Sequence, residues 1–345
     1  MKAIVFEKHG GVEVLEQRDI PEPQISPNEV LICVRATACN YNDIWARRGM
    51  PGMEVIFPHI SGSDAAGEVV EVGSEVKSVK AGDEVAVHCG LSCRVCAACT
   101  SGQEYFCKQF RIWGFQTGPL DGGHAEYCKV PAVNVLHKPK QLSWEEAAAM
   151  PLVLVTAWRK LVTRAGIKPG DTLLIWGAAG GLGVMAVQIG KLFRARVIAV
   201  VGGDEKIEMV KRLGADHAIN RRTENVAEEV KKITNRRGAD IVFEHIGAAT
   251  WPQSFASVKW GGTIVTSGAT TSYEAMTDLR HIFFRQLNIL GSTLGSKGEL
   301  AAAMQHVEQG HIKPVVTQVF PLKEIGVAQR LVEEGKAIGK IVLVP

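Results

Sequence analysis

The stretch TLLIWGAAGGLGV, residues Thr172–Val184, decides the fold of this chain. Its apolar residues are followed at once by a cluster of glycines and then by apolar residues at helical spacing. This order predicts a buried parallel strand, a tight turn and the start of a helix. The glycines would let the backbone approach a pyrophosphate closely, and the helix N-terminus would offer free N–H groups and a partial positive charge. We therefore predict a dinucleotide-binding turn, formed by Gly177, Ala179, Gly180, Gly181, Leu182 and Gly183.

The context of this stretch favours a nucleotide fold over an ordinary strand–turn–helix contact, which a glycine cluster alone would also fit. The pattern departs from G-x-G-x-x-G, because Ala178 stands where the first glycine would be. However, Arg196–Val201 follows at the spacing of a β-α-β unit, and amphipathic segments at Lys206–Leu213 and Val226–Thr234 alternate with further strand candidates. Those strands are Leu173–Trp176, His217–Ile219, Asp240–His245, Gly262–Ser267 and Leu287–Gly291. The alternation predicts a doubly wound parallel sheet.

The segments on either side of this sheet differ in character. Residues 1–90 predict an all-β region, because short apolar runs are separated by turn signals such as Pro-Glu-Pro and Ala-Gly-Asp. A capped helix start at Ser143 begins a mostly helical stretch that reaches Ala165 and is interrupted by Pro151. The predicted elements at the end of the chain are helix Lys297–Glu308, strand Pro314–Phe320, helix Glu324–Glu334 and strand Lys340–Pro345.

Composition limits the class of protein. At 345 residues, with 46% hydrophobic and 22% charged residues, the chain is long enough for two domains with their own cores. A net charge of +3 is too small to indicate nucleic-acid binding, and no apolar run reaches membrane-spanning length. The first residues predict a strand and not a signal peptide. We expect a cytoplasmic protein, in which eight cysteines favour metal binding or free thiols over disulfides.

Four cysteines, Cys93, Cys96, Cys99 and Cys107, form a C-x2-C-x2-C-x7-C pattern among small and polar residues. Four thiolates at this spacing match a closed tetrahedral zinc site, which would order a lobe that has little core of its own. Free thiols in a loop and an iron–sulfur cluster are the alternatives. The tight spacing and the lack of a proline after the last cysteine favour zinc. We therefore predict one structural Zn²⁺ per chain.

Together these features resemble the medium-chain dehydrogenase/reductase superfamily over nearly the whole chain. Besides the cysteine pattern and the glycine stretch, the resemblance is carried by Gly82-Asp83-Glu84-Val85, Asp121–Tyr127 (DGGHAEY) and Gly339-Lys340-Ile341-Val342. It implies an α/β protein with a GroES-like β-rich catalytic domain and a Rossmann domain built on the doubly wound parallel sheet. The implied domains are residues 1–142 with a zinc lobe at 89–110, an NADP-binding domain at 143–292, and a return segment at 293–345 that completes the catalytic domain.

Within this superfamily, the alcohol-dehydrogenase branch binds a second, catalytic zinc through a Cys-x-x-Asp segment, a Gly-His-Glu segment and a later cysteine. The matching positions here hold Asn40, Ser63 and Leu152, which leaves too few ligands for an open catalytic zinc site. Cys39 lies one residue before the first position and could recruit a metal together with Asp64. We favour the absence of a catalytic metal, because these residues resemble the zinc-independent quinone, enone and enoyl-thioester reductases.

Two further stretches, Arg111–Thr117 (RIWGFQT) and Val242–Gly247 (VFEHIG), resemble the crotonyl-CoA reductase/carboxylase group. The resemblance implies that Asn40, Phe115, Gln116 and His245 line a pocket for CO2 beside the enolate. Glutamine stands where that group has an acid, which puts efficient carboxylation in doubt. The histidine could instead be satisfied by backbone at a strand end, but the carboxyl end of a parallel strand favours an active site. Tyr41 is either the proton donor or polarising hydroxyl, or a packing residue near the cofactor.

The turn after the second strand predicts NADPH. An NAD enzyme usually has an acid there, whereas this chain has Gly202-Gly203, which leaves room for a 2′-phosphate. Lys206 and Arg221 lie where this branch places its phosphate-binding residues, and a guanidinium can grip phosphate through two hydrogen bonds. The acidic pair Asp204-Glu205 argues mildly the other way. The resemblance adds Thr156, Ser267 and Gly268 as contacts of the nicotinamide or its ribose.

These expectations define an NADPH-dependent reductase that transfers hydride to the β-carbon of an acryloyl- or crotonyl-CoA-like 2-enoyl thioester. A zinc-independent NADPH quinone or enone oxidoreductase is the alternative enzyme, and a non-catalytic NADPH-binding structural or regulatory protein is the alternative of another class. The partners we expect are a small-molecule substrate and further copies of the chain. The resemblance implies a homodimer joined near Leu287–Gly291 or a homotetramer. We expect neither nucleic acid nor a membrane as a partner.

Overall fold

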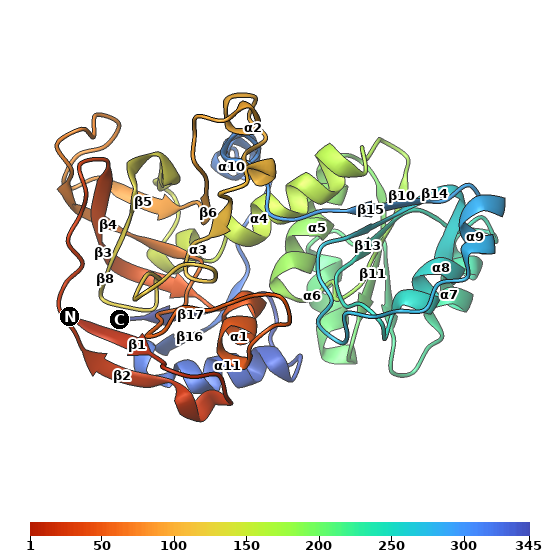
Figure 1. The fold of residues 1–345 in the computed structure, drawn as a ribbon. Coiled ribbons are helices and arrows are strands. Elements are labelled where there is room, and N and C mark those ends of the chain that lie inside the picture. Colours follow the sequence, from red (N-terminus) through yellow and green to blue (C-terminus); the bar gives the residue numbers. More distant parts are fainter. The chain divides into compact units, whose positions relative to one another are not determined.

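The computed structural model describes all residues from Met1 to Pro345 (Figure 1). Its contacts divide the chain into two compact units. The first contains Met1–Leu152, Ser296–Glu308 and Pro314–Pro345, and the second contains Val153–Gly295 and Gln309–Lys313. The sequence analysis places the first domain boundary ten residues earlier, after residue 142. In the structure, the helix that begins at Ser143 therefore belongs to the first unit.

The first unit is built on a seven-stranded sheet in the order β16-β17-β3-β4-β5-β9, with β8 paired to β3. The pair β16–β17 is parallel and the other pairs are antiparallel. The last strand of the chain, β17, thus pairs with β3, a strand from the N-terminal part of the chain (Figure 1). The strands are β3 (Glu29–Ala38), β4 (Ala65–Val72), β5 (Glu84–Val87), β8 (Tyr127–Pro131), β9 (Val135–His137), β16 (Val316–Pro321) and β17 (Lys340–Val344).

Smaller elements complete this unit. Strand β1 (Lys2–Val5) pairs with β2 (Glu16–Asp19), and β6 (Gly90–Leu91) pairs with β7 (Arg111–Ile112), both antiparallel. The helices, besides those described below, are α2 (Ala97–Thr100), α10 (Lys297–Glu308) and α11 (Ile325–Glu333). Single 3₁₀ turns are η1 (Val12–Val14), η2 (Glu104–Phe106), η3 (Ala132–Asn134) and η6 (Leu322–Glu324).

The prediction of an all-β region at residues 1–90 is wrong at one place, where helix α1 (Tyr41–Arg48) follows β3. Asn40 is the N-cap residue, and Asp43 at the third helical position accepts a hydrogen bond from its N–H at 2.7 Å. The helix ends at Gly49, which has a φ of 83°. The capping pair and the terminal glycine are both legible in the sequence, but the helix between them is short.

The second unit contains a six-stranded sheet in the order β12-β11-β10-β13-β14-β15, and every neighbouring pair is parallel. The strands are β10 (Thr172–Ile175), β11 (Arg196–Val201), β12 (His217–Asn220), β13 (Ala239–Glu244), β14 (Val258–Thr266) and β15 (Asn288–Gly291). The helices are α5 (Gly181–Leu192), η5 (Asp204–Lys206), α6 (Ile207–Arg212), α7 (Val226–Ile233), α8 (Trp251–Ser257) and α9 (Leu279–Phe284). This is the predicted doubly wound sheet, and its strand order reverses between β10 and β13, where such sheets bind ligands.

The stretch from Ser143 to Ala165 is helical, but in three pieces. Ser143 and Glu146 form a reciprocal capping box at the start of α3 (Trp144–Ala148), as the sequence predicts. Pro151 is the first residue of α4 (Pro151–Trp158), a position that tolerates proline because its missing N–H has no acceptor there. Helix α4 then runs into a π-helical turn, η4 (Arg159–Arg164), which buries Arg159, Lys160 and Leu161.

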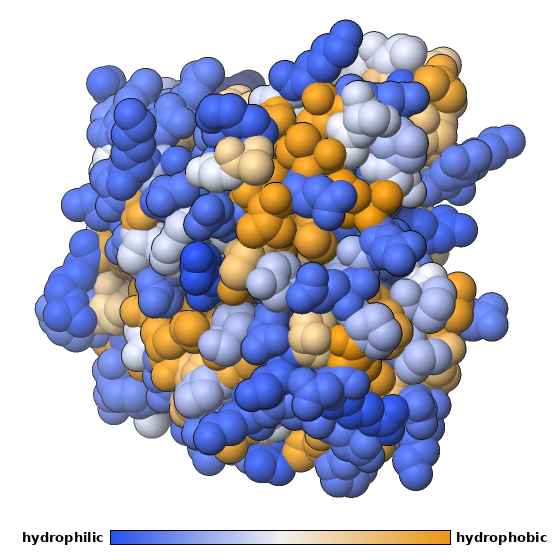
Figure 2. Space-filling model, turned by 90° about the vertical axis from the view of Figure 1, so that its left-hand side faces the viewer, coloured by the Kyte–Doolittle hydropathy of each residue, from blue (hydrophilic) through white to orange (hydrophobic).

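None of the helices combines the length and the apolar character that crossing a bilayer requires. Figure 2 shows one face of the molecule, on which hydrophilic side chains surround separate hydrophobic areas. The apolar residues of the parallel strands lie inside the second unit, where Leu174, Ile198, Val242 and Ile264 belong to one buried cluster.

Gly183→Ala should destabilise the protein. A Cβ at this position would lie 2.3 Å from the carbonyl oxygen of Gly177 and 2.6 Å from the Cα of Ala178, and both are backbone atoms that cannot turn away. Overpacking of this kind typically costs about 1–3 kcal/mol. Gly180→Ala is the matched control, because its Cβ would meet Gly177 at an ordinary 3.5 Å. Denaturant unfolding without coenzyme measures the difference, and equal stability of the two variants would contradict the prediction.

Candidate functional site

The glycine stretch forms the turn between β10 and α5. Gly177 has a φ of 58°, a left-handed conformation that glycine adopts without strain. Gly180 caps the helix, and the first intrahelical hydrogen bond runs from Val184 N–H to the Gly180 carbonyl at 2.9 Å. The N–H groups of Gly181, Leu182 and Gly183 therefore lie at the helix N-terminus with no intrahelical acceptor, which suits a bound phosphate group.

The turn after β11 gathers positive charge. The guanidinium of Arg221 lies 3.6 Å from where a Cβ on Gly202 would be, so the glycine leaves it room. Burial lowers the pKa of Lys206, and the charges of Arg222 and Arg221 act in the same direction, opposed by Glu205. Asp204 accepts a hydrogen bond from Asn220 Nδ2 at 2.8 Å and is thereby tied to the neighbouring strand. The turn thus offers cations and space where a nucleotide ribose carries its 2′ substituent.

His245 lies at the carboxyl end of β13, beside two glycine-containing turns. A Cβ added to Gly177 would lie 3.0 Å from His245 Nε2. A Cβ added to Gly268 would lie 3.1 Å from the His245 carbonyl oxygen. Burial, and next the charge of Lys160, lower the pKa of this imidazole to about 3. Two polar atoms at this edge, His245 Nδ1 and Ser267 Oγ, are buried and have no hydrogen-bond partner. Such atoms call for a ligand group or water.

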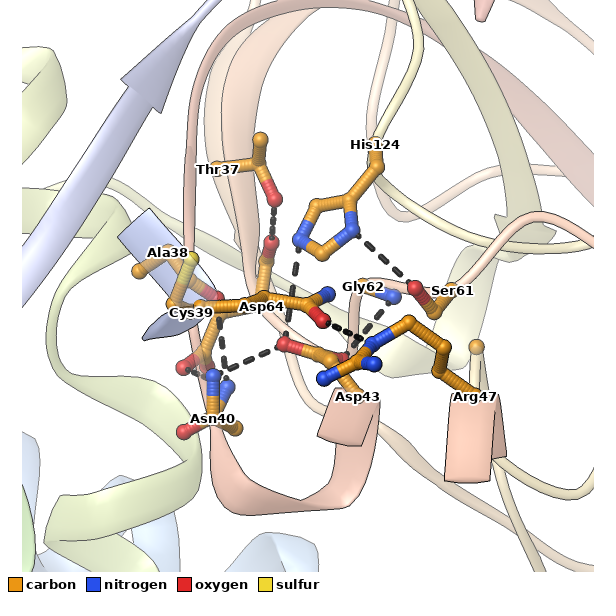
Figure 3. A network of polar contacts seen from close by, with 12 residues as sticks. Thr37, Ala38, Cys39, Asn40, Asp43, Arg47, Ser61, Gly62, Asp64 and His124 are labelled. Carbon is orange, nitrogen blue, oxygen red and sulfur yellow. Dashed lines mark hydrogen bonds and ion pairs between the residues drawn. The ribbon is translucent and has the colours of Figure 1, made fainter. Parts of the chain in front are cut away.

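In the first unit, Asp64 connects the three segments at which the alcohol-dehydrogenase branch holds its catalytic metal. Its Oδ1 accepts from Leu152 N–H at 3.0 Å, and its Oδ2 accepts from Asn40 Nδ2 at 2.9 Å (Figure 3). The Lys340 ammonium donates to Asp64 Oδ2 at 3.1 Å, to Asn40 Oδ1 at 2.6 Å and to the Cys39 carbonyl at 2.8 Å. All of these polar side chains are buried. Burial and Asp43 raise the pKa of the Cys39 thiol, which disfavours the thiolate that a metal would need.

Asp43 and His124 lie on the other side of this network (Figure 3). Asp43 accepts from the N–H groups of Asn40 at 2.7 Å and Gly62 at 3.1 Å, and burial raises its pKa to about 7. His124 Nε2 is 3.8 Å from Asp43 Oδ2, and burial lowers the pKa of this imidazole to about 3. Burial thus favours the uncharged form of both side chains.

Of the other predicted residues of the first unit, Tyr41 and Phe115 belong to a group of neighbouring aromatic rings, and Gln116 follows Phe115 in sequence. The Tyr41 and Trp45 rings are 5.1 Å apart, and Trp45 and Phe115 are 6.4 Å apart. Phe115 is buried, whereas Tyr41 is only partly buried. Gln116 Oε1 accepts from the Ile112 N–H at 3.1 Å, so its amide closes the turn after β7.

The four cysteines converge as a metal site requires. Their Sγ atoms all lie within 4.8 Å of one another, and they form the single cluster of metal-ligating side chains in the structure. Backbone N–H groups of Arg94 and Gln109 donate to Cys99 and Cys107 sulfur at 3.3 and 3.4 Å. Backbone hydrogen bonds also lower the pKa of the Cys93 thiol to about 6. Four close thiols with backbone donors fit a structural zinc.

The predicted residues fall into both units. Asn40, Tyr41, Phe115, Gln116 and the cysteines lie in the first; His245 and the predicted coenzyme contacts lie in the second. The sequence analysis did not predict that Lys340 and Lys160 are buried. Lys340 was visible as the polar first residue of the apolar strand KIVLV, a position where a buried charge needs a partner. Nothing in the local sequence distinguishes Lys160 from a solvated helix lysine.

Comparison with known proteins now identifies the class. The family model of the alcohol dehydrogenase GroES-like domain matches residues 26–140, and that of the zinc-binding dehydrogenase matches residues 181–309. The chain belongs to the medium-chain dehydrogenase/reductase superfamily, and both halves of the predicted fold are confirmed.

Its relatives come from two branches of that superfamily. A crotonyl-CoA carboxylase/reductase of Cereibacter sphaeroides is 35% identical, covering 94% of this chain and 82% of the relative. An alcohol dehydrogenase of Geobacillus stearothermophilus is 33% identical over 99% of both. Among solved structures, an NAD-dependent alcohol dehydrogenase superposes with a TM-score of 0.95 at 41% identity over 100% of both chains. A 2-octenoyl-CoA carboxylase reductase in complex with NADP and 2-octenoyl-CoA superposes with a TM-score of 0.90 at 33% identity, covering 99% of this chain and 87% of that one.

Lys340→Met should destabilise the protein by about 3–5 kcal/mol, because it leaves the Asp64 carboxylate buried without its cation. Lys336→Met is the matched control, since that exposed lysine pairs with Glu334 at the surface and its loss should cost under about 1 kcal/mol. Denaturant unfolding of both variants tests the prediction. Equal, small effects would show that the Asp64 network does not depend on the ammonium group.

Metal analysis should find one zinc per chain, and the Cys96→Ser/Cys99→Ser double variant should lose it and melt at a lower temperature. The reason is that two of four converging thiolates are then missing. Cys128→Ser, at a buried cysteine of β8 outside the cluster, should keep the metal. Full zinc retention by the double variant, or iron in place of zinc, would refute this assignment.

Proposed function

We propose that this chain is an NADPH-dependent reductase that transfers hydride to the β-carbon of a 2-enoyl thioester of the acryloyl- or crotonyl-CoA kind. The observation that carries the proposal is the polar network of the first unit. Where the alcohol-dehydrogenase branch binds its catalytic zinc, Asn40 and Leu152 hydrogen-bond to Asp64, and neither a thiolate nor an imidazole stands at the ligand positions. The crotonyl-CoA carboxylase/reductase relatives support the thioester as substrate.

The reaction reduces a conjugated double bond. NADPH would supply the hydride for the β-carbon, the electron pair of the double bond moves toward the thioester carbonyl, and a proton adds to the α-carbon. The chain must hold the carbonyl oxygen, where negative charge develops, and provide the proton. We assign the second task to Tyr41, whose hydroxyl belongs to a partly buried side chain next to the capped start of α1. We assign the first to Asn40, whose amide donates to Asp64 and to the Ala38 carbonyl and would exchange the longer of these bonds, 3.3 Å to Ala38, for the substrate carbonyl oxygen.

Two features of the second unit support NADPH as the coenzyme. The cations Lys206, Arg221 and Arg222 gather at the turn after β11, and Gly202 leaves space beside Arg221. The Asp204 carboxylate is engaged by Asn220. Solved relatives are in complex with NADP. Thr156, Ser267 and Gly268 are the proposed contacts of the nicotinamide half.

Reductive carboxylation would be a weak side activity. Gln116 carries no charge, and its Oε1 is already bound to the Ile112 N–H. It therefore provides no carboxylate at the position where the resemblance places an acid beside CO2. The protein would work as a homodimer or homotetramer in the cytoplasm, with one structural zinc per chain.

A quinone or enone reductase remains the second enzyme candidate, because it needs the same hydride chemistry and the same coenzyme contacts.

NADPH oxidation should be faster with acryloyl-CoA or crotonyl-CoA than with a simple quinone, with little carboxylated product when bicarbonate is added. Tyr41→Phe should lower kcat by about 10²–10⁴-fold with NADPH affinity unchanged, since general acid catalysis contributes on that scale. Asn40→Ala should lower kcat in the same assay. Tyr273→Phe, at an exposed tyrosine, is the control. Turnover with quinone alone would move the protein to the second candidate, and binding of NADPH without turnover of any substrate would support a non-catalytic role.

A further inference from the structure

The side-chain amide of Asn220 connects the turn after β11 to the turn after β12. Asn220 is the last residue of β12, is 4% exposed and lies opposite Val201, the last residue of β11. Its Oδ1 accepts a hydrogen bond from the N–H of Arg222 at 3.0 Å, and its Nδ2 donates to Asp204 Oδ1 at 2.8 Å. Because a backbone N–H can only donate, the amide oxygen must face Arg222 and the amide NH2 must face Asp204.

These two turns lie beside the predicted dinucleotide-binding turn. The Ala178 N–H donates to the Val200 carbonyl at 3.0 Å, which joins the glycine turn to β11. The Arg221 N–H donates to the Val201 carbonyl at 3.0 Å, which joins the turn after β12 to the end of the same strand. A pyrophosphate at the N-terminus of α5 would therefore direct the adenosine ribose to the turn after β11, and this turn contains Asp204.

An acid in this turn bears on the choice between the two nicotinamide coenzymes. A carboxylate that faces the ribose accepts a hydrogen bond from the 2′-hydroxyl of NADH and repels the strongly negative 2′-phosphate of NADPH. We propose that Asn220 is a positioning residue for coenzyme selectivity, which holds the Asp204 carboxylate away from the ribose and so favours NADPH. The role rests on the coenzyme of the proposed function and is independent of its thioester substrate.

Asn220 also stabilises its own turn, and the two contributions can be separated. Its carbonyl oxygen accepts from the N–H groups of Thr223 and Glu224 at 3.1 and 2.9 Å, and its Oδ1 accepts from the N–H of Arg222. These bonds stay within the turn after β12, whereas the Nδ2 bond crosses to Asp204. Removal of the Asp204 carboxylate therefore abolishes the selectivity role and leaves the structural role in place.

Titration of coenzyme fluorescence measures the dissociation constants of NADPH and NADH without any substrate. The wild-type chain should bind NADPH more tightly than NADH. In Asn220→Ala the ratio of the two constants should shift toward NADH by about tenfold, the scale of one hydrogen bond to a charged group. In the Asp204→Ala background the same substitution should leave the ratio unchanged, because no carboxylate remains to be held.

Asn288→Ala, at an exposed asparagine of β15 on the opposite edge of the sheet, is the matched control and should bind both coenzymes as the wild type does. Should Asn220→Ala fold poorly, Asn220→Ser takes its place in both backgrounds. Serine keeps an acceptor for the Arg222 N–H but is too short to hold Asp204.

Three results would overturn the proposal: an unchanged ratio in folded Asn220→Ala, an equal shift with and without the Asp204 carboxylate, or a wild-type preference for NADH. The equal shift would show that Asn220 acts only through the shape of its own turn. The expected ratios together with no turnover of any enoyl thioester would support the role of Asn220 and reject the proposed reaction alone.

Discussion

The buried Lys340 ammonium group donates to three oxygen atoms, and much of the first unit is arranged around it. One oxygen belongs to the backbone at Cys39, one to the amide of Asn40 and one to the carboxylate of Asp64. A charge buried to this degree is tolerated only when every proton finds an acceptor and the opposite charge is near. Because Asp64 also accepts from Asn40 and Leu152, four distant segments become mutually dependent. Removing the polar side chain of Asn40, Asp64 or Lys340 alone would leave a buried polar atom unpaired.

Two buried ionisable side chains of the second unit, Glu244 and Lys160, differ in how many hydrogen-bond partners they have. Glu244 is surrounded by donors from its own loop and from α8, so its charge is spread over hydrogen bonds that are nearby in sequence. Lys160 has one carbonyl and an aromatic face, which stabilise an ammonium group far less. Burial therefore lowers the pKa of Lys160 well below its ordinary value.

Features with a sequence period or a local signature were predictable, and features made by distant partners were not. The parallel strands were found because their apolar runs alternate with amphipathic helices, and the start of α3 because Ser143 and Glu146 form a capping box. Helix α1 was missed, because its eight residues show little periodicity and stand between strands. Asn40 was recognised by resemblance, but its partner Lys340 lies 300 residues away, a separation that no spacing rule covers. The cluster of four cysteines could be predicted because all four lie in one short segment of the sequence.

The place of β17 in the sheet bears on how the chain matures during synthesis. The second unit is continuous from Val153 to Gly295 apart from five later residues, so nearly all of it can fold while translation continues. The first unit, in contrast, is assembled from three separate segments of the chain. Its N-terminal 152 residues are synthesised first, yet β3 pairs with β17 and Asp64 pairs with Lys340, which follows it by 276 residues. The part of the polypeptide that is synthesised first is therefore completed last, and Asp64 stays without its counter-ion until β17 has been synthesised.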